Sequence, residues 1–521
     1  MSTVKENPGF SAGTIARSTS VLTSGTLLSR ILGFVRDILF ARFFGTGAGA
    51  DAFVTAFRLP NLFRDIMGEG AANSAFVPVM MQYRHKQSGE VGEFLGACFF
   101  WALLILCGIT AAGMLFAPQL IRCIAPGFAD TPGKFELAVV LTRIMFPYLI
   151  LIGLTALLSA VQFTYGSFFA PALGPALMNG VLILSIFVSI IFFSDNPVYG
   201  LALGVLVGGL AQYLFQQAAL RRVGLWIVPP RRMFNEGASR VGRLILPRIA
   251  GSAVYQLNIF VDTICASLGS VVGSGGIAAI YYATRLVQLP MGLFAVALST
   301  ASLPSLSAHA AAGRKEEFDK TLVFALRNIV FVMLPASVFL VCFAVPVVRV
   351  LFERGVFDAH STYQTASALL FYSLALTGYG ASRILASAFH ALQDTRTPVI
   401  VALICLGVNA LLDVILMFPL GLSGLALASA VSSVVNVFLL RKFLRARLAA
   451  PVLVPAAFFV RVLLCSSLAV VVASAGMALV SFLPEFAGLV FAGCFFVAAY
   501  FFFARAMGFE QAGQILKLFR R

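Results

Sequence analysis

A few charged side chains stand inside otherwise apolar runs, where charge is costly and therefore a candidate for function. Near the start of the chain one such run contains Arg30, Arg36 and Asp37, and two later runs contain Arg64 and Arg285. Arg30 and Asp37 are seven positions apart and would share one face of a helix, whereas Arg36 would lie about 120° further round. Several guanidinium groups around an aqueous cavity favour a phosphate-bearing ligand, which they bind bidentately while staying charged. The alternative is that each arginine reaches toward the membrane surface or pairs with a neighbouring carboxylate.

A second group of polar residues is acidic. Asp262, Asn409 and Asp413 lie in apolar surroundings, and Ser429 adds a hydroxyl in the next run. The four-residue spacing puts Asn409 and Asp413 on one helix face. Carboxylates with neutral oxygens at similar depth suit Na⁺ or a protonation site. The alternative is interhelical hydrogen bonding that only fixes packing.

Signatures of an enzyme are missing from the sequence. The eight cysteines show no C-x-x-C spacing, and the four histidines form no cluster. There is no Walker loop, nucleophile elbow or H-E-x-x-H motif. We therefore expect neither catalysis nor an organic cofactor.

The elements that position these residues follow from composition. Of 521 residues, 60% are hydrophobic and 11% charged, whereas soluble proteins carry about 25% charged residues. The chain is therefore predicted to be an all-α polytopic membrane protein, because a spanning helix needs about 20 mostly apolar residues. Fourteen transmembrane helices are predicted, at 18–44, 51–82, 92–117, 135–163, 168–193, 198–220, 243–267, 276–308, 322–350, 362–391, 397–418, 422–444, 453–481 and 485–506.

The basic residues alternate between the loops. Lysine and arginine gather in every second loop and in the C-terminal tail, and the opposite loops are nearly bare. The exceptions on or near the bare side are Arg122, Lys134, Arg349 and Arg354. The positive-inside rule then puts both termini in the cytoplasm. The net charge of +16 is explained by this topology, so no nucleic-acid partner is expected.

Short motifs recur at a nearly constant offset of 224 to 230 residues. Arg58-Leu59 recurs as Arg285-Leu286, and Asn179 recurs as Asn409. Six helices per repeat give two lobes of the same orientation, the parallel-repeat arrangement, with the substrate expected between them. The predicted domains are an N-lobe (1–222), a basic cytoplasmic linker (223–242), a C-lobe (243–447), and two appended helices with the C-terminal tail (448–521).

Several of these motifs together resemble a known family. The segment Ser29-Arg-Ile-Leu-Gly-Phe-Val-Arg-Asp37, the segment Leu59-Pro-Asn-Leu-Phe-Arg64 and the segment Tyr281-Tyr-Ala-Thr-Arg285 are similar to those of the MurJ/MviN lipid II flippases. The resemblance covers essentially the whole chain, including the fourteen helices. It implies a protein of the bacterial inner membrane that moves undecaprenyl-diphosphate-linked peptidoglycan precursor to the outer leaflet by alternating access.

The resemblance also implies roles for individual residues. Substrate would be held in a central cavity by Arg30, Arg36, Asp37, Arg64 and Arg285. A sodium site would be formed by Asp262, Asn409, Asp413, Ser429 and a backbone carbonyl near Leu425. Helices 13 and 14 would form a groove for the polyprenyl tail. Na⁺ and the membrane potential are the candidate driving forces, and cell-wall synthesis proteins are candidate partners besides the lipid and the membrane.

Three other functions are weighed against this one. Two belong to the same superfamily: a flippase for another polyprenyl-diphosphate glycan, and a cation-coupled drug antiporter. A drug antiporter should need acidic cavity residues, so the arginines argue against it. The third is a membrane scaffold, which should tolerate loss of the arginines.

Overall fold

The computed structural model describes residues 12–66, 72–86, 88–222, 224–227, 229–230, 233–448, 454–480 and 482–513. Within these ranges the side chains of 63–66 and 246–255 are among those left undescribed. All regular structure in the described ranges is helical. The chain divides into two compact units, Met1–Gln256 and Leu257–Arg521, each of which is described by itself.

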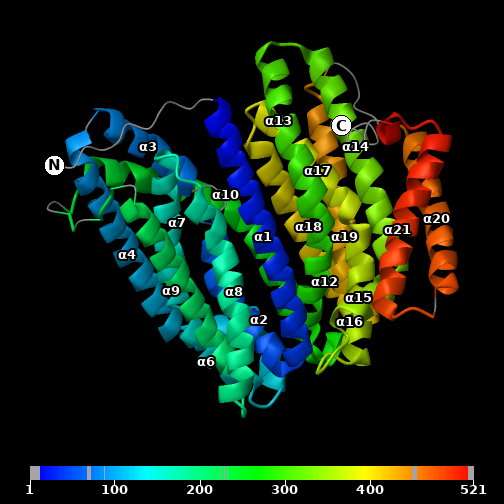
Figure 1. Ribbon diagram of the computed structural model, residues 1–521, viewed down its shortest axis with the longest axis horizontal. Helices are drawn as coiled ribbons and strands as arrows, with labels where there is room; N and C mark the ends of the chain where they lie inside the picture. Colours follow the sequence, from blue (N-terminus) through cyan, green and yellow to red (C-terminus); the bar gives the residue numbers. More distant parts are fainter. Residues whose placement is uncertain are drawn as a thin grey trace. The chain divides into compact units, whose positions relative to one another are not determined.

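The first unit is a bundle of long helices joined by short turns (Figure 1). Its helices are α1 (Ala12–Phe44), α2 (Ala48–Ile66), α3 (Ala72–Lys86), α4 (Val91–Leu115), α5 (Ala117–Ile124), α6 (Lys134–Met145), α7 (Tyr148–Thr164), α8 (Phe169–Phe192), α9 (Val198–Arg222) and the first part of α10 (Glu236–Ser267). Two short 3₁₀ turns, η2 (Ser88–Glu90) and η3 (Pro126–Asp130), complete it. Helix α1 packs along α8, which in turn packs along α9.

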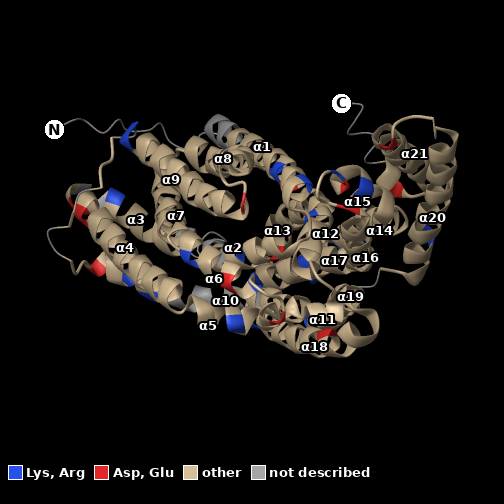
Figure 2. Cartoon of the chain, turned by 90° about the horizontal axis from the view of Figure 1, so that it is seen from below, with Lys and Arg blue, Asp and Glu red and all other residues tan. Residues whose placement is uncertain are grey.

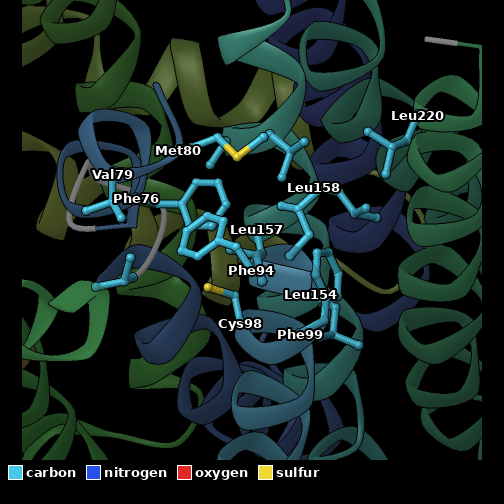
Figure 3. Close-up of a cluster of buried hydrophobic side chains, with 14 of the residues drawn as sticks. Phe76, Val79, Met80, Phe94, Cys98, Phe99, Leu154, Leu157, Leu158 and Leu220 are labelled. Atoms are coloured by element: carbon cyan, nitrogen blue, oxygen red, sulfur yellow. The ribbon is translucent and has the colours of Figure 1, made fainter. Parts of the chain in front are cut away.

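A cluster of buried apolar side chains fixes α3 against α4 and α7 (Figure 3). Phe76 of α3 and Phe94 of α4 stack with ring centroids 5.6 Å apart, and Tyr83 stacks on Phe94 at 4.4 Å. Leu154 and Leu158, one helical turn apart, bring the same face of α7 into the cluster. This packing holds the end of the bundle from which α10 begins, because Tyr83 also donates a hydrogen bond to Asn235.

The second unit repeats the pattern of long helices (Figure 1). After the end of α10 it contains α11 (Gly269–Val272), α12 (Gly276–Pro290), α13 (Val296–Ala311), α14 (Lys315–Cys342), α15 (Ala344–Phe352), α16 (Ala359–Leu374), α17 (Leu376–Ala391), α18 (Arg396–Leu420), α19 (Leu422–Arg445), α20 (Ala456–Leu479) and α21 (Glu485–Ala506). Helices α18 and α19 form one antiparallel hairpin, and α20 and α21 form another.

A π-helical turn, η4 (Met291–Ala295), joins α12 to α13. It follows Pro290, which has no backbone N–H to donate and therefore disrupts the regular hydrogen-bond ladder. The predicted span 276–308 is thus one helical rod with an irregular turn in its middle. Arg285 lies on α12, just before this turn.

Ten helical segments are long and apolar enough to cross a membrane, searched over the described residues. They are Val91–Leu115, Lys134–Thr164, Phe169–Phe192, Val198–Arg222, Gly276–Ala311, Lys315–Cys342, Arg396–Leu420, Leu422–Arg445, Ala456–Leu479 and Glu485–Ala506. Figure 2 shows charged residues thinly spread among uncharged ones along these helices. The prediction of an all-helical membrane protein is confirmed at this level.

Four of the fourteen predicted spans are not among these ten. Helix α1 occupies the predicted span 18–44, and α2 and α3 occupy 51–82. Helix α10 occupies 243–267, and α16 and α17 occupy 362–391. Three of them carry the charged residues singled out above, which lower their mean hydropathy: Arg30 and Arg36, Arg64, and Asp262. The number fourteen and the domain limits, including the linker at 223–242, therefore stay predictions.

Candidate functional site

The cationic group of the first unit is centred on Arg36 of α1. Its guanidinium forms an ion pair with Asp37, with Nη2 at 2.7 Å and Nε at 3.0 Å from Oδ1. Nη1 donates to Oδ1 of Asn179 on α8 at 2.9 Å. The Arg36 side chain is 16% exposed and that of Asp37 only 4%. Arg36 is therefore held in one orientation by two partners while keeping access to its surroundings.

Asn179 ties this arrangement to the helix pair. Its amide nitrogen donates to the backbone carbonyl of Ser29 at 3.0 Å, so that one α8 side chain contacts two turns of α1. Gly33 lies between these turns, and a Cβ there would stand 3.3 Å from the Asn179 Nδ2 atom. The glycine thus permits the close approach that the hydrogen bonds need. Asn179 was not among the predicted site residues, although its repeat partner Asn409 was.

The other predicted cationic residues are placed differently. Arg30 is exposed on α1 and makes no hydrogen bond or ion pair with the described part of the chain. Arg64 falls in α2, but its side chain lies outside the described residues. Arg285, in the second unit, is half-buried; it lies over the ring of Tyr281 at 4.8 Å and donates to Gln288 Oε1 at 3.1 Å. The structure thus joins Arg36 to Asp37, and the gathering of all four arginines around one cavity stays a prediction.

The predicted acidic group is brought together within the second unit. The Asn409 amide nitrogen donates to Asp262 Oδ1 at 3.0 Å and to Asp413 Oδ2 at 2.8 Å. It therefore bridges α10 and α18. Asn409 is 1% exposed and Asp413 is fully buried, whereas Asp262 is half-buried. Two carboxylates sharing one amide donor in an apolar setting need further positive charge or a proton to be stable.

Helices α16 and α19 complete this acidic group. Leu425 and Ser429 of α19 are buried, one helical turn apart, and α19 packs on both α18 and α16. Tyr372 of α16 is also buried, and its hydroxyl interacts electrostatically with Asp262 and Asp413. Sequence reasoning missed Tyr372, because a single tyrosine in an apolar run is usually a packing residue. Its polar hydroxyl inside the predicted span 362–391 was the available signal.

Two oxygens of this acidic group have no hydrogen-bond partner among the described residues. They are Asn409 Oδ1 and Asp413 Oδ1, both of them buried. Native proteins seldom leave buried polar atoms unpaired, so each such atom calls for an explanation. Oxygens of this kind, next to two carboxylates, have the donor chemistry of a hard-cation site. Over the described residues no cluster of three or more His, Cys, Asp or Glu side chains suited to a metal ion is found.

A buried ion pair lies elsewhere in the first unit. Lys134, at the start of α6, binds Asp51 of α2 with 2.7 Å between Nζ and Oδ2, and it also lies 4.4 Å from the Phe128 ring centroid. The two side chains are 7% and 2% exposed. Lys134 is one of the basic exceptions on the bare side, and this partner neutralises its charge.

Comparisons with known proteins agree with these features. A family profile described as "Lipid II flippase MurJ" matches residues 40–502. A "Probable lipid II flippase MurJ" of Buchnera aphidicola is 37% identical over 81% of this chain and 82% of its own length. The "Lipid II flippase MurJ" of Burkholderia cenocepacia is 36% identical over 83% of this chain and 84% of its own length.

Solved structures show the same relationship. The structure titled "Lipid II flippase MurJ, inward closed conformation" superposes with a TM-score of 0.79 at 28% identity, covering 93% of this chain and 98% of that one. An inward-facing multidrug resistance MATE family transporter of the MOP superfamily superposes with a TM-score of 0.66 at 16% identity, covering 82% of this chain and 99% of that one. At this identity the likeness indicates a shared fold alone.

The extent of these matches decides the family. The profile covers most of the chain, and the relatives are matched over more than four-fifths of their own length. The expectation of a multi-pass membrane transporter rather than an enzyme is thereby confirmed. The chain belongs to the MurJ family of lipid II flippases.

Proposed function

We propose that this protein translocates lipid II, the undecaprenyl-diphosphate-linked peptidoglycan precursor, from the cytoplasmic to the outer leaflet of the bacterial inner membrane. The observation that carries the proposal is the family match over residues 40–502. The relatives named as lipid II flippases, at about 35% identity over most of the chain, support it.

The proposed topology has fourteen spans in a 6 + 6 + 2 arrangement, with both termini in the cytoplasm. The alternation of basic and bare loops supports this orientation. The two six-helix lobes would rock about the substrate to give alternating access, and α20 and α21 would contact the polyprenyl tail.

In this proposal the arginines bind the diphosphate. Arg36 is pre-oriented by Asp37 and Asn179, so little side-chain entropy is lost when it engages a phosphate. Arg30 is exposed on the same helix and can follow the ligand. Arg64 and Arg285 would complete the set as the lobes move. Guanidinium groups suit this task because they stay charged at every physiological pH.

The acidic group is proposed to bind Na⁺. Asp413 Oδ1 and Asn409 Oδ1 would be ligands, because both are buried without a hydrogen-bond partner in the described chain. Asp262, the Ser429 hydroxyl and the Leu425 carbonyl would complete the set, and Tyr372 stands beside them. A cation here would neutralise carboxylates of α10 and α18 and so favour the packing of these helices on each other and on α19. Transport could in this way draw on a sodium gradient as well as on the membrane potential.

Complementation tests the transport function. Expression of this chain in a strain depleted of its own lipid II flippase should restore growth and the exposure of lipid II on the outer leaflet. Arg30→Ala, Arg36→Ala and Arg285→Ala should each abolish rescue, whereas Arg461→Ala, on the exposed surface of α20, should retain it. Rescue failure by the unaltered chain would favour another polyprenyl-diphosphate glycan. Rescue by all three arginine variants would favour a scaffold.

Thermal unfolding of the purified protein tests the sodium site. Replacing KCl by NaCl at constant ionic strength should raise the unfolding temperature, and Asp413→Ala should remove the difference. Asp319→Asn, which changes a buried carboxylate of α14 in the same unit, serves as the control and should keep it. An Asp413→Ala variant with an unchanged sodium response would rule out this site.

A further inference from the structure

A cavity of about 390 Å³ lies between the end of α15 and the first turn of α21, within the second unit. It is lined by Arg349, Val350, Glu353, Arg354, Glu485 and Phe486. Its volume is in the range of small-molecule sites, which is about 300–1,000 Å³. It shares no residue with the predicted arginine set or with the acidic group described above.

The cavity carries charges of both signs that are only partly paired. Arg349 Nε lies 3.4 Å from Glu353 Oε2, and that same oxygen accepts a hydrogen bond from Thr362 at 2.8 Å. Among the described residues, the Arg354 guanidinium donates to the Val350 carbonyl alone, at 3.2 Å. Among the described residues, neither Arg354 nor Glu485 forms an ion pair. A guanidinium and a carboxylate therefore face one cavity without neutralising each other.

The surroundings of the cavity indicate where it sits in a bilayer. Helix α21 is one of the candidate spans, and the cavity is at its first turn. Phe486 is 59% exposed, and Val490, one turn further along, is 49% exposed. Such side chains on a spanning helix contact acyl chains. The charged cavity at the end of the span would then be level with the phospholipid headgroups.

We propose that this cavity binds the headgroup of a zwitterionic aminophospholipid. The phosphate would bind Arg354, with Arg349 nearby, through charge-assisted hydrogen bonds. The primary ammonium would donate to the Glu485 carboxylate, and the acyl chains would lie against Phe486 and Val490. A headgroup of this kind supplies a negative phosphate for Arg354 and a positive ammonium for Glu485.

The same charges argue against other lipids. The lining carries two arginines and two glutamates, so it offers no net positive charge to a net anionic headgroup. A choline headgroup has no N–H to donate, so it would leave Glu485 without a hydrogen bond. A bound aminophospholipid would link α21 to α15 and thereby hold the α20–α21 hairpin against the rest of its unit. This inference does not depend on the identity of the transported substrate.

Native mass spectrometry of the detergent-solubilised full chain tests the proposal. The protein would be mixed separately with phosphatidylethanolamine, phosphatidylcholine and phosphatidylglycerol of identical acyl chains. We expect phosphatidylethanolamine to be retained about tenfold better than either of the others, the size of one charge-assisted hydrogen-bonded pair. Equal retention of phosphatidylcholine, or better retention of phosphatidylglycerol, would overturn the proposal.

Variants separate the two halves of the site. Glu485→Gln should lower phosphatidylethanolamine retention to that of phosphatidylcholine, and Glu485→Lys should shift the preference to phosphatidylglycerol. Arg354→Gln should weaken phosphatidylethanolamine and phosphatidylcholine alike, because both offer the same phosphate. Arg505→Gln, an exposed arginine at the other end of α21, is the control and should change nothing. Selectivity that survives Glu485→Lys would place the lipid elsewhere and refute the assignment.

Discussion

Removing one partner of the Lys134–Asp51 pair should destabilise the first unit strongly. The Nζ–Oδ2 distance is 2.7 Å, and neither side chain is more than 7% exposed. Asp51→Leu would leave a buried ammonium whose remaining favourable contact, among the described residues, is the Phe128 ring. Loss of one partner of a buried pair typically costs about 3–5 kcal/mol. The cation–π contact with Phe128 is present in both the parent and the variant, so it does not change this difference.

The double variant Asp51→Leu/Lys134→Met makes this prediction specific. With both charges replaced by apolar groups, the part of the loss that comes from the unpaired ammonium should be recovered. Asp51 also makes a further interaction, which the double variant does not restore. The assay is equilibrium unfolding in detergent micelles for the parent, both single variants and the double variant. Glu317→Gln is the matched control. Its pair with Lys320 is 3.5 Å long with side chains 70% and 50% exposed, and it should cost less than about 1 kcal/mol.

Two results would contradict the reasoning. A cost below about 1 kcal/mol for Asp51→Leu would mean that the ammonium is solvated or finds another anion. A double variant as unstable as the sum of the single variants would mean that the residues act independently.

Three further predictions concern single positions. Hydrogen bonds from Thr397 lower the pKa of Asp394 below its usual 3.8, with a smaller contribution from the Arg447 guanidinium. The carboxylate therefore stabilises the fold above that value and loses this effect as pH falls through the lowered pKa. Melting curves should show Asp394→Asn less stable than the parent near neutral pH, with the gap closing below pH about 4. Gly33→Val should lower the free energy of unfolding by about 1–3 kcal/mol, because the added side chain meets Asn179. Gly242→Val is the control and should not show this clash, because a Cβ at Gly242 has no atom within 4 Å. Asn409→Asp should lower the melting temperature unless Na⁺ is present, since it adds a third carboxylate to the acidic group. Asn179→Asp should keep the acceptor for Arg36 but lose the donor to the Ser29 carbonyl, so it should lower the melting temperature whether or not Na⁺ is present.

The sequence predicted which residues share a face of one helix better than it predicted which residues form contacts between helices. The four-residue spacing of Asn409 and Asp413 correctly placed them on one face of α18, because helical geometry fixes that relation. The sequence also grouped Asp262 with them by depth, but it could not show that the Asn409 amide bridges both carboxylates. That contact depends on the axial register of α10 against α18, which side-chain packing sets.

Side-chain reach explains another difference. The helical periodicity put Arg30 with Asp37 on one face and Arg36 apart from them, yet the ion pair joins the neighbours Arg36 and Asp37. A guanidinium on a long flexible stem can bend back to the adjacent residue, so angular separation on a helix is a weak guide for arginine. Arg36 is therefore fixed by Asn179 across the helix interface and not by helical phase alone.

Two of these contacts are separated by the offset of the repeated sequence motifs. Asn179 and Asn409 are separated by 230 positions and Arg36 and Asp262 by 226, both within the offsets of the repeated motifs. In each unit the asparagine bonds the residue at the equivalent place on the facing helix, α8 to α1 and α18 to α10. An amide can serve both cases because it offers an acceptor to a guanidinium and a donor to a carboxylate. A charged residue at the asparagine position would repel one of the two. The neutral asparagine is therefore compatible with a cation on the facing helix in the first unit and with a carboxylate on the facing helix in the second.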